Sequence, residues 1–499
     1  MKKKVKSILC KQGYLLKKEY FDKAQLEDIR RELTVVPHIQ GDYGKKPDKF
    51  KVYRENDDFI SLPKYYGLAK YNKPDKNGEI EGEKADINFK GELRDYQIDI
   101  IEQIMDTLNR KDGGLLSLGC GQGKTVLALY VATVLKVKTL VIVHKSFLLN
   151  QWKERAEQFT DASLGIIRQN KVEIDGKDIV IGMLQSISKQ KYDEDLFSDF
   201  GLVIFDEAHH APSRYFSRAL PIITCKKTLA LSATPYRNDK LEKVLFWYFG
   251  DILYKAPKKC NDSVLVKIYK YSCCHKRFKE IRFNYNGKIC IARTLNNIVK
   301  IKERNTFIIN LLVSVLKKEP LRKILFLGDR IEQLEYLKEK FDEYEICESD
   351  FYIGRMKMKQ LKKAEDAQVL FATYSMASEA LDIPSLNTLF LITSRKNVEQ
   401  SVGRILRKND HIVQPLIVDI VDNLKVYVNQ GYARRKYYKS LNYNIELNEV
   451  KNNEILSSEM IDYPKKKKDE PIIESDDEDN DGFIDSDEDE DEKEITTTN

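Results

Sequence analysis

The chain has 499 residues, of which 42% are hydrophobic and 32% are charged. This length excludes a single typical core and predicts two or three globular domains, and no apolar run approaches the roughly 18 to 20 residues of a membrane span, so we expect no membrane partner. The net charge of +6 is uneven, because residues 469–494 carry sixteen acids and one lysine and leave about +21 on the rest; a basic body favours a polyanionic partner, although a solvated lysine-rich surface explains the charge as well.

The first 88 residues differ in composition from the rest of the chain. The start, MKKKVKSILC, is basic but lacks the apolar stretch of a secretory signal. Eight scattered cysteines without a Cys-x-x-Cys pair indicate a reducing, intracellular compartment. Within residues 1–88, lysines and aromatic residues interleave, and the pattern of residues 22–33 predicts a helix. We expect a small separate α+β domain over 1–88, which could also contact nucleic acid.

Two later blocks alternate strand and helix patterns, as expected for parallel sheets covered by helices. Residues 89–250 predict one domain and residues 296–425 a second, so the fold class is α/β. Strands are expected in the first block at 139–143, 178–184, 201–206 and 228–234, with a helix at 146–159. In the second block they are expected at 323–328, 368–373, 388–393 and 415–420.

The first block contains a candidate phosphate-binding loop, LGCGQGKT. It follows the apolar segment GGLLSLG and opens a predicted helix, which is the context in which such a loop binds phosphate. Backbone N–H groups and the helix N-terminus would surround the phosphates, Lys124 would reach the β and γ oxygens, and the Thr125 hydroxyl would bind Mg²⁺. Leu118 replaces the usual first glycine. The predicted nucleotide-binding loop residues are Leu118, Gly119, Cys120, Gly121, Gln122, Gly123, Lys124 and Thr125.

A pair of acids, Asp206 and Glu207, ends the predicted strand 201–206. Functional groups gather at the carboxyl ends of parallel strands, and two adjacent carboxylates can divide the work of ATP hydrolysis. Asp206 would hold Mg²⁺, directly or through water, while Glu207 polarises the attacking water. An ordinary acidic turn is the alternative, and the phosphate loop upstream favours the catalytic interpretation.

Residues 251–295 predict a polar connection between the two blocks. A loose group of cysteines and one histidine lies in it: Cys260, Cys273, Cys274, His275 and Cys290. Adjacent cysteines match the usual spacing of tetrahedral zinc ligands poorly, so the sequence does not favour a zinc site.

The C-terminal region divides into two segments. Residues 426–463 are basic and aromatic and predict a helical extension. Residues 464–499 predict a disordered acidic tail, because they cannot bury enough apolar area to offset ordering. Within the tail, PKKKK at 464–468 resembles a nuclear-import signal, and a solvated charge run explains it nearly as well.

The tail also contains DEDNDGFIDSDE, which matches a calcium-binding EF-hand loop. Its flanks are not amphipathic helices and no second loop pairs with it, so the acidic composition alone can explain the match. The matching positions are Asp477, Asp479, Asp481, Gly482, Asp485 and Glu488.

Six motifs occur in one order along the chain: LRDYQ (93–97), GCGQGKT (119–125), DEAH (206–209), SAT (232–234), TYSMASEALDIP (373–384) and QSVGRILR (400–407). Over roughly residues 90–425 the chain resembles the superfamily 2 helicases of DEAH type. Within them it is similar to the XPB-like branch, and most of all to the transcript-release helicases of poxviruses and other large DNA viruses. The resemblance implies two tandem RecA-like domains, ATP and Mg²⁺ as cofactors, and DNA or RNA as a partner.

The resemblance also assigns roles outside the phosphate loop. It implies that Gln97 reads the adenine, and that residues 373–384 touch both the nucleic-acid backbone and ATP. Ala380 replaces a glycine usual in that motif, which leaves its backbone geometry open. As a lone histidine, His209 would more often be structural. The residues expected to couple ATP to nucleic acid are His209, Ser232, Thr234, Asp382, Gln400 and Gly403.

Arg404 and Arg407 lie three residues apart in the last motif. Helical spacing puts both guanidinium groups on one face, and we expect that face to meet the γ-phosphate of ATP bound to the first block. Arginine suits this role because it stays charged and binds phosphate oxygens bidentately. A helix that carries them for solubility alone is the alternative.

The sequence therefore predicts an ATP-dependent helicase or translocase that acts on DNA or DNA–RNA hybrids in transcription or repair. A non-catalytic scaffold of a transcription complex is the alternative, but such a scaffold needs none of Lys124, Glu207 or the paired arginines. A restriction translocase fused to a nuclease is a third option, although no nuclease carboxylate pattern lies outside the core. RNA polymerase or transcription factors are possible partners, and the nucleus, or a virion or virus factory, is a possible location.

Overall fold

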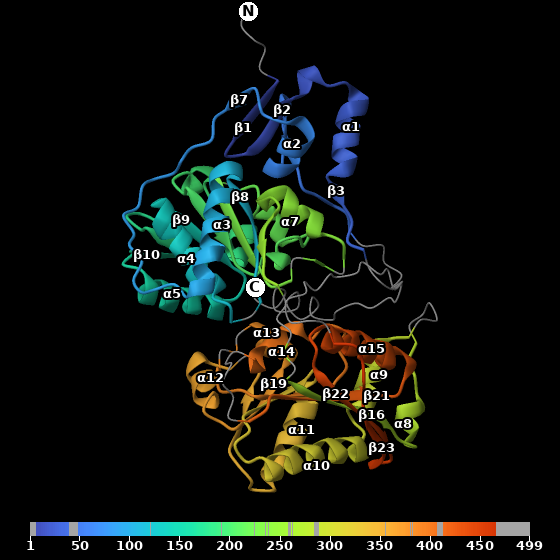
Figure 1. Ribbon diagram of the computed structural model, residues 1–499. Helices are drawn as coiled ribbons and strands as arrows, with labels where there is room; N and C mark the ends of the chain where they lie inside the picture. Colours follow the sequence, from blue (N-terminus) through green and yellow to red (C-terminus); the bar gives the residue numbers. More distant parts are fainter. Residues whose placement is uncertain are drawn as a thin grey trace, which may run out of the picture. The chain divides into compact units, whose positions relative to one another are not determined.

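The computed structural model of the protein has two compact units. The first holds residues 1–256 apart from 41–44, and the second holds 257–499 together with 41–44. Figure 1 labels the helices and strands of both. No helix within the described part of the chain has the length and apolar character needed to cross a bilayer. The described residues are 6–465 without 39–47, 120, 191, 224, 235, 238, 258–260, 262, 284–288, 355, 380, 382 and 407–412.

The first unit is built on an eight-stranded sheet, in the order β11-β10-β12-β9-β13-β14-β8-β15. All neighbours are parallel except β10 and β11. The strands are β8 (Gly113–Ser117), β9 (Thr139–Val143), β10 (Leu164–Arg168), β11 (Lys171–Val172), β12 (Ile179–Met183), β13 (Leu202–Phe205), β14 (Lys227–Ser232) and β15 (Ile252–Lys255). The strands expected in this block are confirmed, with small shifts at their ends.

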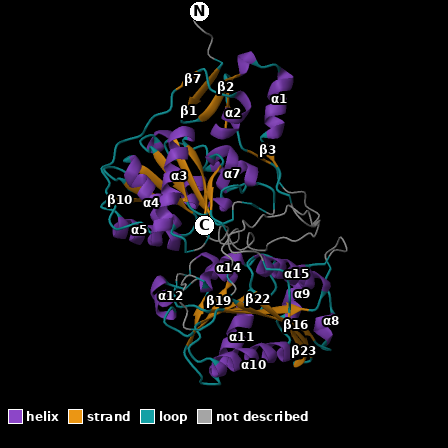
Figure 2. Ribbon diagram, in the orientation of Figure 1, coloured by secondary structure: helices purple, strands orange, loops and turns teal. Residues whose placement is uncertain are grey.

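Helices cover both faces of this sheet, so its central strands have the continuous apolar sequences typical of buried parallel strands. Alternate residues face opposite sides: Leu115 and Leu140 join the core under α6 and α7, while Leu116 and Val141 join the core under α3, α4 and α5. The helices are α3 (Asp95–Lys111), α4 (Lys124–Leu135), α5 (Ser146–Phe159), α6 (Leu184–Lys189) and α7 (Glu242–Phe249) (Figure 2).

The N-terminal region is an α+β module, as expected. Its mostly antiparallel sheet has the order β5-β6-β2-β1-β7, with a separate β3–β4 pair. The elements are β1 (Ser7–Cys10), β2 (Gly13–Lys17), α1 (Lys23–Glu32), β3 (Thr34–Val35), β4 (Phe50–Lys51), β5 (Arg54–Glu55), β6 (Phe59–Leu62), α2 (Lys64–Tyr71) and β7 (Lys76–Asn77).

This module is not a separate domain, in contrast to the expectation from its composition. Its apolar side chains share one core with the eight-stranded sheet of the same unit. The rings of Tyr66 and Trp247 meet edge to face at 5.3 Å. The buried Lys64 ammonium lies 2.5 Å from Glu79 and donates to the carbonyl of Lys226 at 2.8 Å. Composition changes at residue 88, but packing continues across that boundary.

The second unit has its own eight-stranded sheet, in the order β18-β19-β17-β20-β21-β16-β22-β23. All neighbours are parallel except β22 and β23. The strands are β16 (Leu265–Ser272), β17 (Ile324–Gly328), β18 (Ser349–Tyr352), β19 (Val369–Thr373), β20 (Thr388–Leu391), β21 (Leu416–Asp422), β22 (Asn444–Lys451) and β23 (Glu454–Met460). The four strands expected in this block are confirmed.

Helices again cover the sheet, with α10 and α11 on one face and α14 and α15 on the other (Figure 2). Side chains of α10 and α11 share a core with alternate residues of the central strands. The helices are α8 (Lys276–Lys279), α9 (Ile291–Ile298), α10 (Lys302–Lys318), α11 (Ile331–Asp342), α12 (Met358–Ala364), α13 (Tyr374–Glu379), α14 (Glu399–Ile405) and α15 (Lys425–Ser440).

The segment 251–295 is more than the connection that its polar composition suggested. Its first residues form β15, which pairs with β8 in the first unit, and 265–272 form β16, which pairs on both sides in the second sheet. β16 alternates buried and partly exposed residues over most of its length. The lysines at its partly exposed positions made the segment look like a polar connection in the sequence. The described residues contain no group of three or more His, Cys, Asp and Glu that could hold a metal ion, and Cys260 lies outside them.

The segment 426–463 is helical only in its first part. After α15 the chain forms β22 and β23, an antiparallel hairpin joined by Asn452 and Asn453. Both asparagines have positive φ, 48° and 71°, the conformation that a two-residue hairpin turn needs and that asparagine tolerates. The EF-hand-like loop and most of the import-like PKKKK lie outside the described residues.

Candidate ATP site

The phosphate loop connects β8 to α4 in the first unit, as predicted. Gly121 and Gly123 have φ of 77° and 81°, a left-handed conformation that favours glycine. The amide of Gly119 donates to Gln122 Oε1 at 2.7 Å, and the amide of the buried Leu118 donates to the carbonyl of Ser232. The loop therefore lies beside the end of β14. Cys120 is outside the described residues.

Gln97, the predicted adenine contact, lies against the loop. It is buried in the first turn of α3, and a Cβ added at Gly123 would come within 2.4 Å of its Nε2. Its Oε1 accepts a hydrogen bond from the Arg94 amide at 3.0 Å and so caps the helix. The adjacent Tyr96 hydroxyl donates to the carbonyl of Gln122 at 3.3 Å. These contacts join α3 to the loop; the adenine role stays a prediction.

The acidic pair lies at the carboxyl end of β13. Asp206 is buried and accepts hydrogen bonds from Trp152 Nε1 at 2.8 Å and from the Glu207 amide at 3.0 Å. Burial and the neighbouring charge of Glu207 raise the pKa of the Asp206 carboxyl, and the indole donor opposes them. A cation beside Asp206 would favour its ionised form.

Lys124 and Glu207 face each other. Lys124 Nζ lies 3.8 Å from Glu207 Oε1 and also donates to the carbonyl of Leu118 at 3.2 Å. Glu207 has a φ of 46°, which is uncommon for a residue with a side chain and is the kind of strain that accumulates at functional sites. The structure thus brings together the cation and the carboxylate to which the sequence assigned ATP chemistry.

A chain of polar contacts leads from this pair to the SAT motif. His209 Nδ1 lies 3.4 Å from Glu207 Oε2 and 3.1 Å from Ser232 Oγ. The amide of Thr234 donates to Ser232 Oγ at 3.2 Å. Thr125, at the start of α4, is partly exposed. Of the predicted coupling residues of the first unit, His209 therefore contacts the predicted catalytic glutamate directly, and Ser232 and Thr234 connect to it through His209.

Three histidine rings lie close together beside these contacts, tilted against one another by 32° and 40°. The His210 ring lies 4.1 Å from that of His144 and 4.3 Å from that of His209, measured between centroids. Burial and the surrounding cations hold the pKa of His210 well below its ordinary value. The His210 ring is therefore neutral near pH 7.

The predicted residues of the second unit lie on and near α14. Arg404 is buried, and its Nη1 donates to the carbonyl of Leu381 at 2.6 Å. Gln400 and Gly403, on the same helix, are partly exposed. The structure therefore links the QSVGRILR helix to the end of segment 373–384. Arg407, Asp382 and Ala380 lie outside the described residues.

Several polar residues at these sites were missed by the sequence analysis. In the first unit they are Trp152, which binds Asp206, and Arg237, whose guanidinium donates to the carbonyl of His209 and pairs with Asp239 at 2.5 Å. In the second unit, Arg395 stacks on the ring of Tyr374 at 4.6 Å and pairs with Asp329 at 3.1 Å. The position of Arg237, three residues after the SAT motif, could have drawn attention to it, whereas no sequence spacing connects Trp152 to Asp206.

The chain is similar in sequence to several known proteins. Residues 90–237 match the family model of the type III restriction enzyme res subunit. A protein of Acanthamoeba polyphaga mimivirus, named as an ATP-dependent RNA helicase, is 36% identical over 458 residues, 89% of this chain and 88% of its own. The DNA 3'-5' translocase XPB2 of Sulfurisphaera tokodaii is 27% identical over 402 residues, 72% of this chain and 89% of its own.

Among solved structures, the fold is similar to that of a fragment of a type I restriction enzyme subunit from Vibrio vulnificus. The TM-score is 0.53 at 13% identity, over 74% of this chain and 71% of that one. At this identity the likeness concerns the fold alone.

Proposed function

The chain belongs to the superfamily 2 helicases, and on that premise we propose that it couples ATP hydrolysis at the Lys124–Glu207 site to movement along a DNA or RNA strand. The ATP-dependent helicase activity is that of the family. The residues that perform it and the polymer on which it acts are the proposal. The observation that carries it is the contact chain from Lys124 through Glu207 and His209 to Ser232.

The first unit would supply the groups that bind the phosphates and activate the attacking water. Backbone amides of the glycine loop and the ammonium of Lys124 would bind the β- and γ-phosphates. Glu207 would orient and polarise the attacking water, as a carboxylate held by a nearby cation can do. Through His209 the charge at Glu207 bears on Ser232 and Thr234, so these two residues would respond to the nucleotide state.

The donor set around Asp206 fits Mg²⁺. This ion is usually held by one or two protein ligands, with phosphate and water oxygens completing its shell. The Asp206 carboxylate keeps lone pairs beyond the two hydrogen bonds that it accepts, and Thr125 places a hydroxyl at the start of α4. We assign Mg²⁺ to these two residues, where it would neutralise charge on the phosphates when bound.

In the second unit, Arg404 and Arg407 are proposed to act on the γ-phosphate. The support is chemical: guanidinium forks suit phosphate oxygens, and the residues occupy the last of six motifs in their family order. We propose that three further residues of the second unit transmit the change in nucleotide state to the residues that bind the nucleic acid: Asp382, Gln400 and Gly403.

The polymer is the open part of the proposal, since one relative is named for RNA and another for DNA. Transcription or repair, with RNA polymerase or transcription factors as partners, is the setting that we propose.

ATP hydrolysis should be measured with duplex DNA, single-stranded DNA, RNA and no polymer, with Glu207→Gln as the inactive control. We expect at least one polymer to stimulate the wild type and none to stimulate the variant. Hydrolysis no faster than that of the variant in any condition would favour the scaffold alternative, and equal measurable rates in all four would contradict coupling to a polymer.

A further inference from the structure

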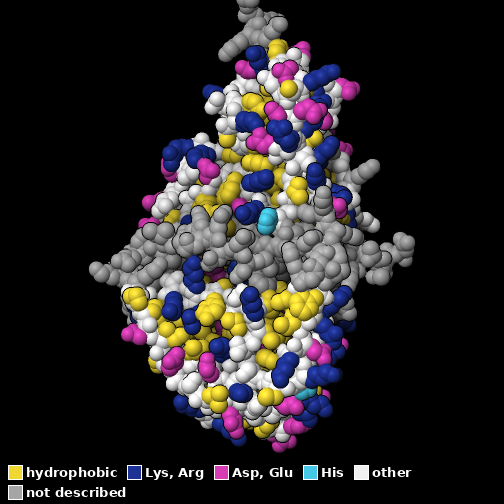
Figure 3. All heavy atoms as spheres, turned by 90° about the vertical axis from the view of Figure 1, so that its right-hand side faces the viewer, with side chains coloured by type: hydrophobic (Ala, Val, Ile, Leu, Met, Phe, Trp, Pro, Cys, Tyr) yellow, Lys and Arg dark blue, Asp and Glu magenta, His cyan; other side chains and the backbone are white. Residues whose placement is uncertain are grey.

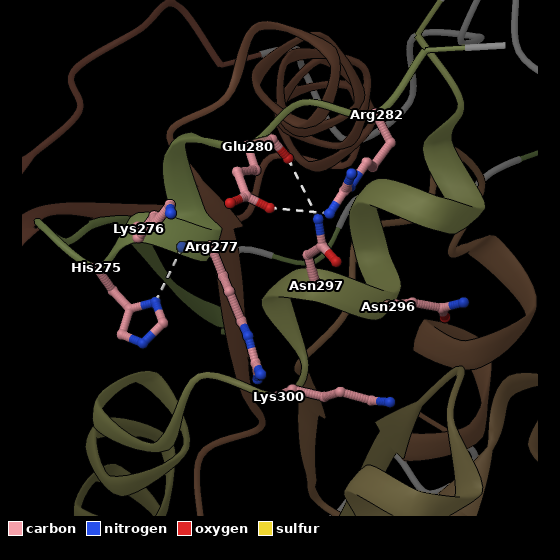
Figure 4. A pocket seen from close by; sticks show the side chains of 8 residues that line it. All are labelled: His275, Lys276, Arg277, Glu280, Arg282, Asn296, Asn297 and Lys300. Carbon is pink, nitrogen blue, oxygen red and sulfur yellow. Dashed lines mark hydrogen bonds and ion pairs between the residues drawn. The ribbon is translucent and has the colours of Figure 1, made fainter.

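A basic pocket lies in the second unit, at its α8–α9 corner (Figure 4). Its volume is about 470 Å³, within the range of ligand sites. It is separate from α14 and from segment 373–384. The lining residues are His275, Lys276, Arg277, Glu280, Arg282, Asn296, Asn297 and Lys300.

The walls of this pocket are held by hydrogen bonds between side chains and backbone groups. His275 Nδ1 caps α8 by accepting from the Arg277 amide at 3.1 Å. The Arg282 amide donates to Thr294 Oγ1 of α9 at 3.1 Å, and Asn297 Nδ2 donates to the carbonyl of Glu280 at 3.4 Å. The segment before α9 is thereby tied to α9, which holds in place the backbone from which the charged side chains extend.

Positive charge in the pocket is only partly compensated. Glu280 is the one acid in the lining, and it pairs with Arg282 at 3.0 Å. Lys300 lies 3.9 Å from Glu332, an exposed carboxylate that contributes little in water. Among the described residues, the side chains of Lys276 and Arg277 form no ion pair. Figure 4 shows Arg277 extending from α8 toward Lys300. An anion entering here would relieve the repulsion among these cations.

The lining also indicates which anion fits. None of its eight residues is apolar or aromatic apart from the His275 imidazole, so the pocket offers no stacking pair for a nucleobase. Guanidinium, ammonium and amide donors suit phosphate oxygens. The lining holds four Lys or Arg and one acid, whereas Lys and Arg are interspersed with Asp and Glu over the face shown in Figure 3.

We propose that this pocket binds backbone phosphates of the nucleic-acid strand on which the protein acts, at a contact point independent of the ATP site. The inference rests on the proposed function, because it assumes a nucleic-acid substrate. Such binding is independent of sequence and is driven by release of condensed counterions. Lys276 and Arg277 are its principal cations.

The test is the salt dependence of single-stranded DNA binding by the full chain, followed by fluorescence anisotropy. Each lost phosphate contact should lower the slope of log K against log [salt] by about 0.7. The double variant Lys276→Gln/Arg277→Gln should therefore lose roughly 1.4 from the slope, with basal ATP hydrolysis and thermal unfolding unchanged. Arg277→Lys keeps the charge and should keep the slope.

A matched control is Lys317→Gln/Lys318→Gln. These lysines are exposed at the far end of α10, where Lys318 lies roughly 24 Å of helical rise from Lys302 at the start of the helix. Their removal changes net charge equally and should leave the slope unchanged. An equal loss in both double variants would show diffuse attraction and overturn the proposal, as would an unchanged slope in the pocket variant.

Two further outcomes separate the occupants and the two proposals. If the pocket variant binds DNA normally but loses binding of a peptide of residues 469–494, the pocket takes an acidic peptide instead. If the wild type binds no DNA or RNA at all, the proposed function falls and the pocket's role with it. Normal nucleic-acid binding by both the wild type and the pocket variant would overturn only the proposal for the pocket.

Discussion

Trp152 donates a 2.8 Å hydrogen bond to Asp206 and so ties α5 to the end of β13, where the acidic pair begins. Both residues are buried. Because an indole N–H can only donate, this bond favours the ionised carboxylate against the burial and the Glu207 charge that raise its pKa. A tryptophan that sequence analysis did not single out thus orients the residue proposed to hold Mg²⁺.

Trp152→Phe should destabilise the first unit and reduce ATP turnover. An aromatic ring remains, but it is smaller than the indole and the N–H donor is lost; a hydrogen bond to a charged group contributes about 1.5–3 kcal/mol, and the lost buried volume adds to the destabilisation. Urea unfolding should show a lower midpoint, and the Mg²⁺ concentration for half-maximal hydrolysis should rise. Trp247→Phe is the control, since Trp247 packs on Tyr66 in the N-terminal module; equal activity loss in both would contradict the Asp206 role.

Lys124→Ala and Glu207→Gln should each abolish polymer-stimulated hydrolysis, but for different reasons. Loss of the ammonium removes a cation from the β- and γ-phosphates, so nucleotide binding weakens. Loss of the Glu207 charge should leave nucleotide binding nearly intact and stop turnover. Binding and steady-state rates, measured on the same preparations, separate the two. A wild-type rate in Glu207→Gln would remove Glu207 from the mechanism.

Arg407→Ala should reduce ATP turnover by about 10³- to 10⁵-fold, the contribution typical of arginines that meet charge developing on the γ-phosphate. Arg404→Ala should reduce it similarly and also destabilise the second unit, because the Leu381 carbonyl loses its buried donor. Lysine at either position should rescue poorly, since the fork is lost. Rates should be compared with thermal unfolding of each variant.

The first unit without the second offers an independent check on these arginines. It should end at residue 256, because β15 completes its sheet. Residues 1–256 should bind nucleotide weakly and hydrolyse it at a small fraction of the full-length rate. Robust polymer-stimulated turnover by this fragment would show that neither Arg404 nor Arg407 is needed.

Deletion of residues 469–499 should tighten nucleic-acid binding. It removes sixteen acids and one lysine and so raises the net charge from +6 to about +21. If the acids compete with nucleic acid for the basic body, the truncated chain should also show a steeper salt dependence. Equal affinities at low salt would dispose of this competition. Calorimetry on the tail peptide should show no saturable calcium site beyond what magnesium reproduces.

Stability of the first unit should fall below about pH 6.5 because of His210. Burial, His144, His209, Lys145 and Arg237 hold the folded pKa below the unfolded value. Between those two pKa values the unfolded state binds one more proton, so the free energy of unfolding decreases as pH falls, by up to about 1.4 kcal/mol per pH unit. Both tryptophans lie in this unit, so their fluorescence reports its unfolding. His210→Phe should flatten the pH dependence of the free energy of unfolding. An unchanged slope would show that another titrating group causes this dependence.

Much of the fold could be predicted because its signals are local. The eight expected strands of the two parallel sheets were found from apolar runs, which arise where helices cover both faces. The strands of the two large sheets that were missed lie toward their edges: β10, β11 and β15 in the first sheet, and β16, β18, β22 and β23 in the second. There polar residues occupy exposed faces, and the Asn452–Asn453 turn was the one local signal of the hairpin.

By itself, the sequence determined the phosphate loop, the acidic pair and the motif order, because each depends on spacing within a few residues. Tertiary structure alone decided which side chains surround them. It brought Trp152 to Asp206, set His209 between Glu207 and Ser232, and packed the N-terminal module into the core of the first unit. These contacts join strands and helices far apart in the chain, and parallel sheet order determines them, since parallel neighbours are joined by long crossovers whose side chains meet only after folding.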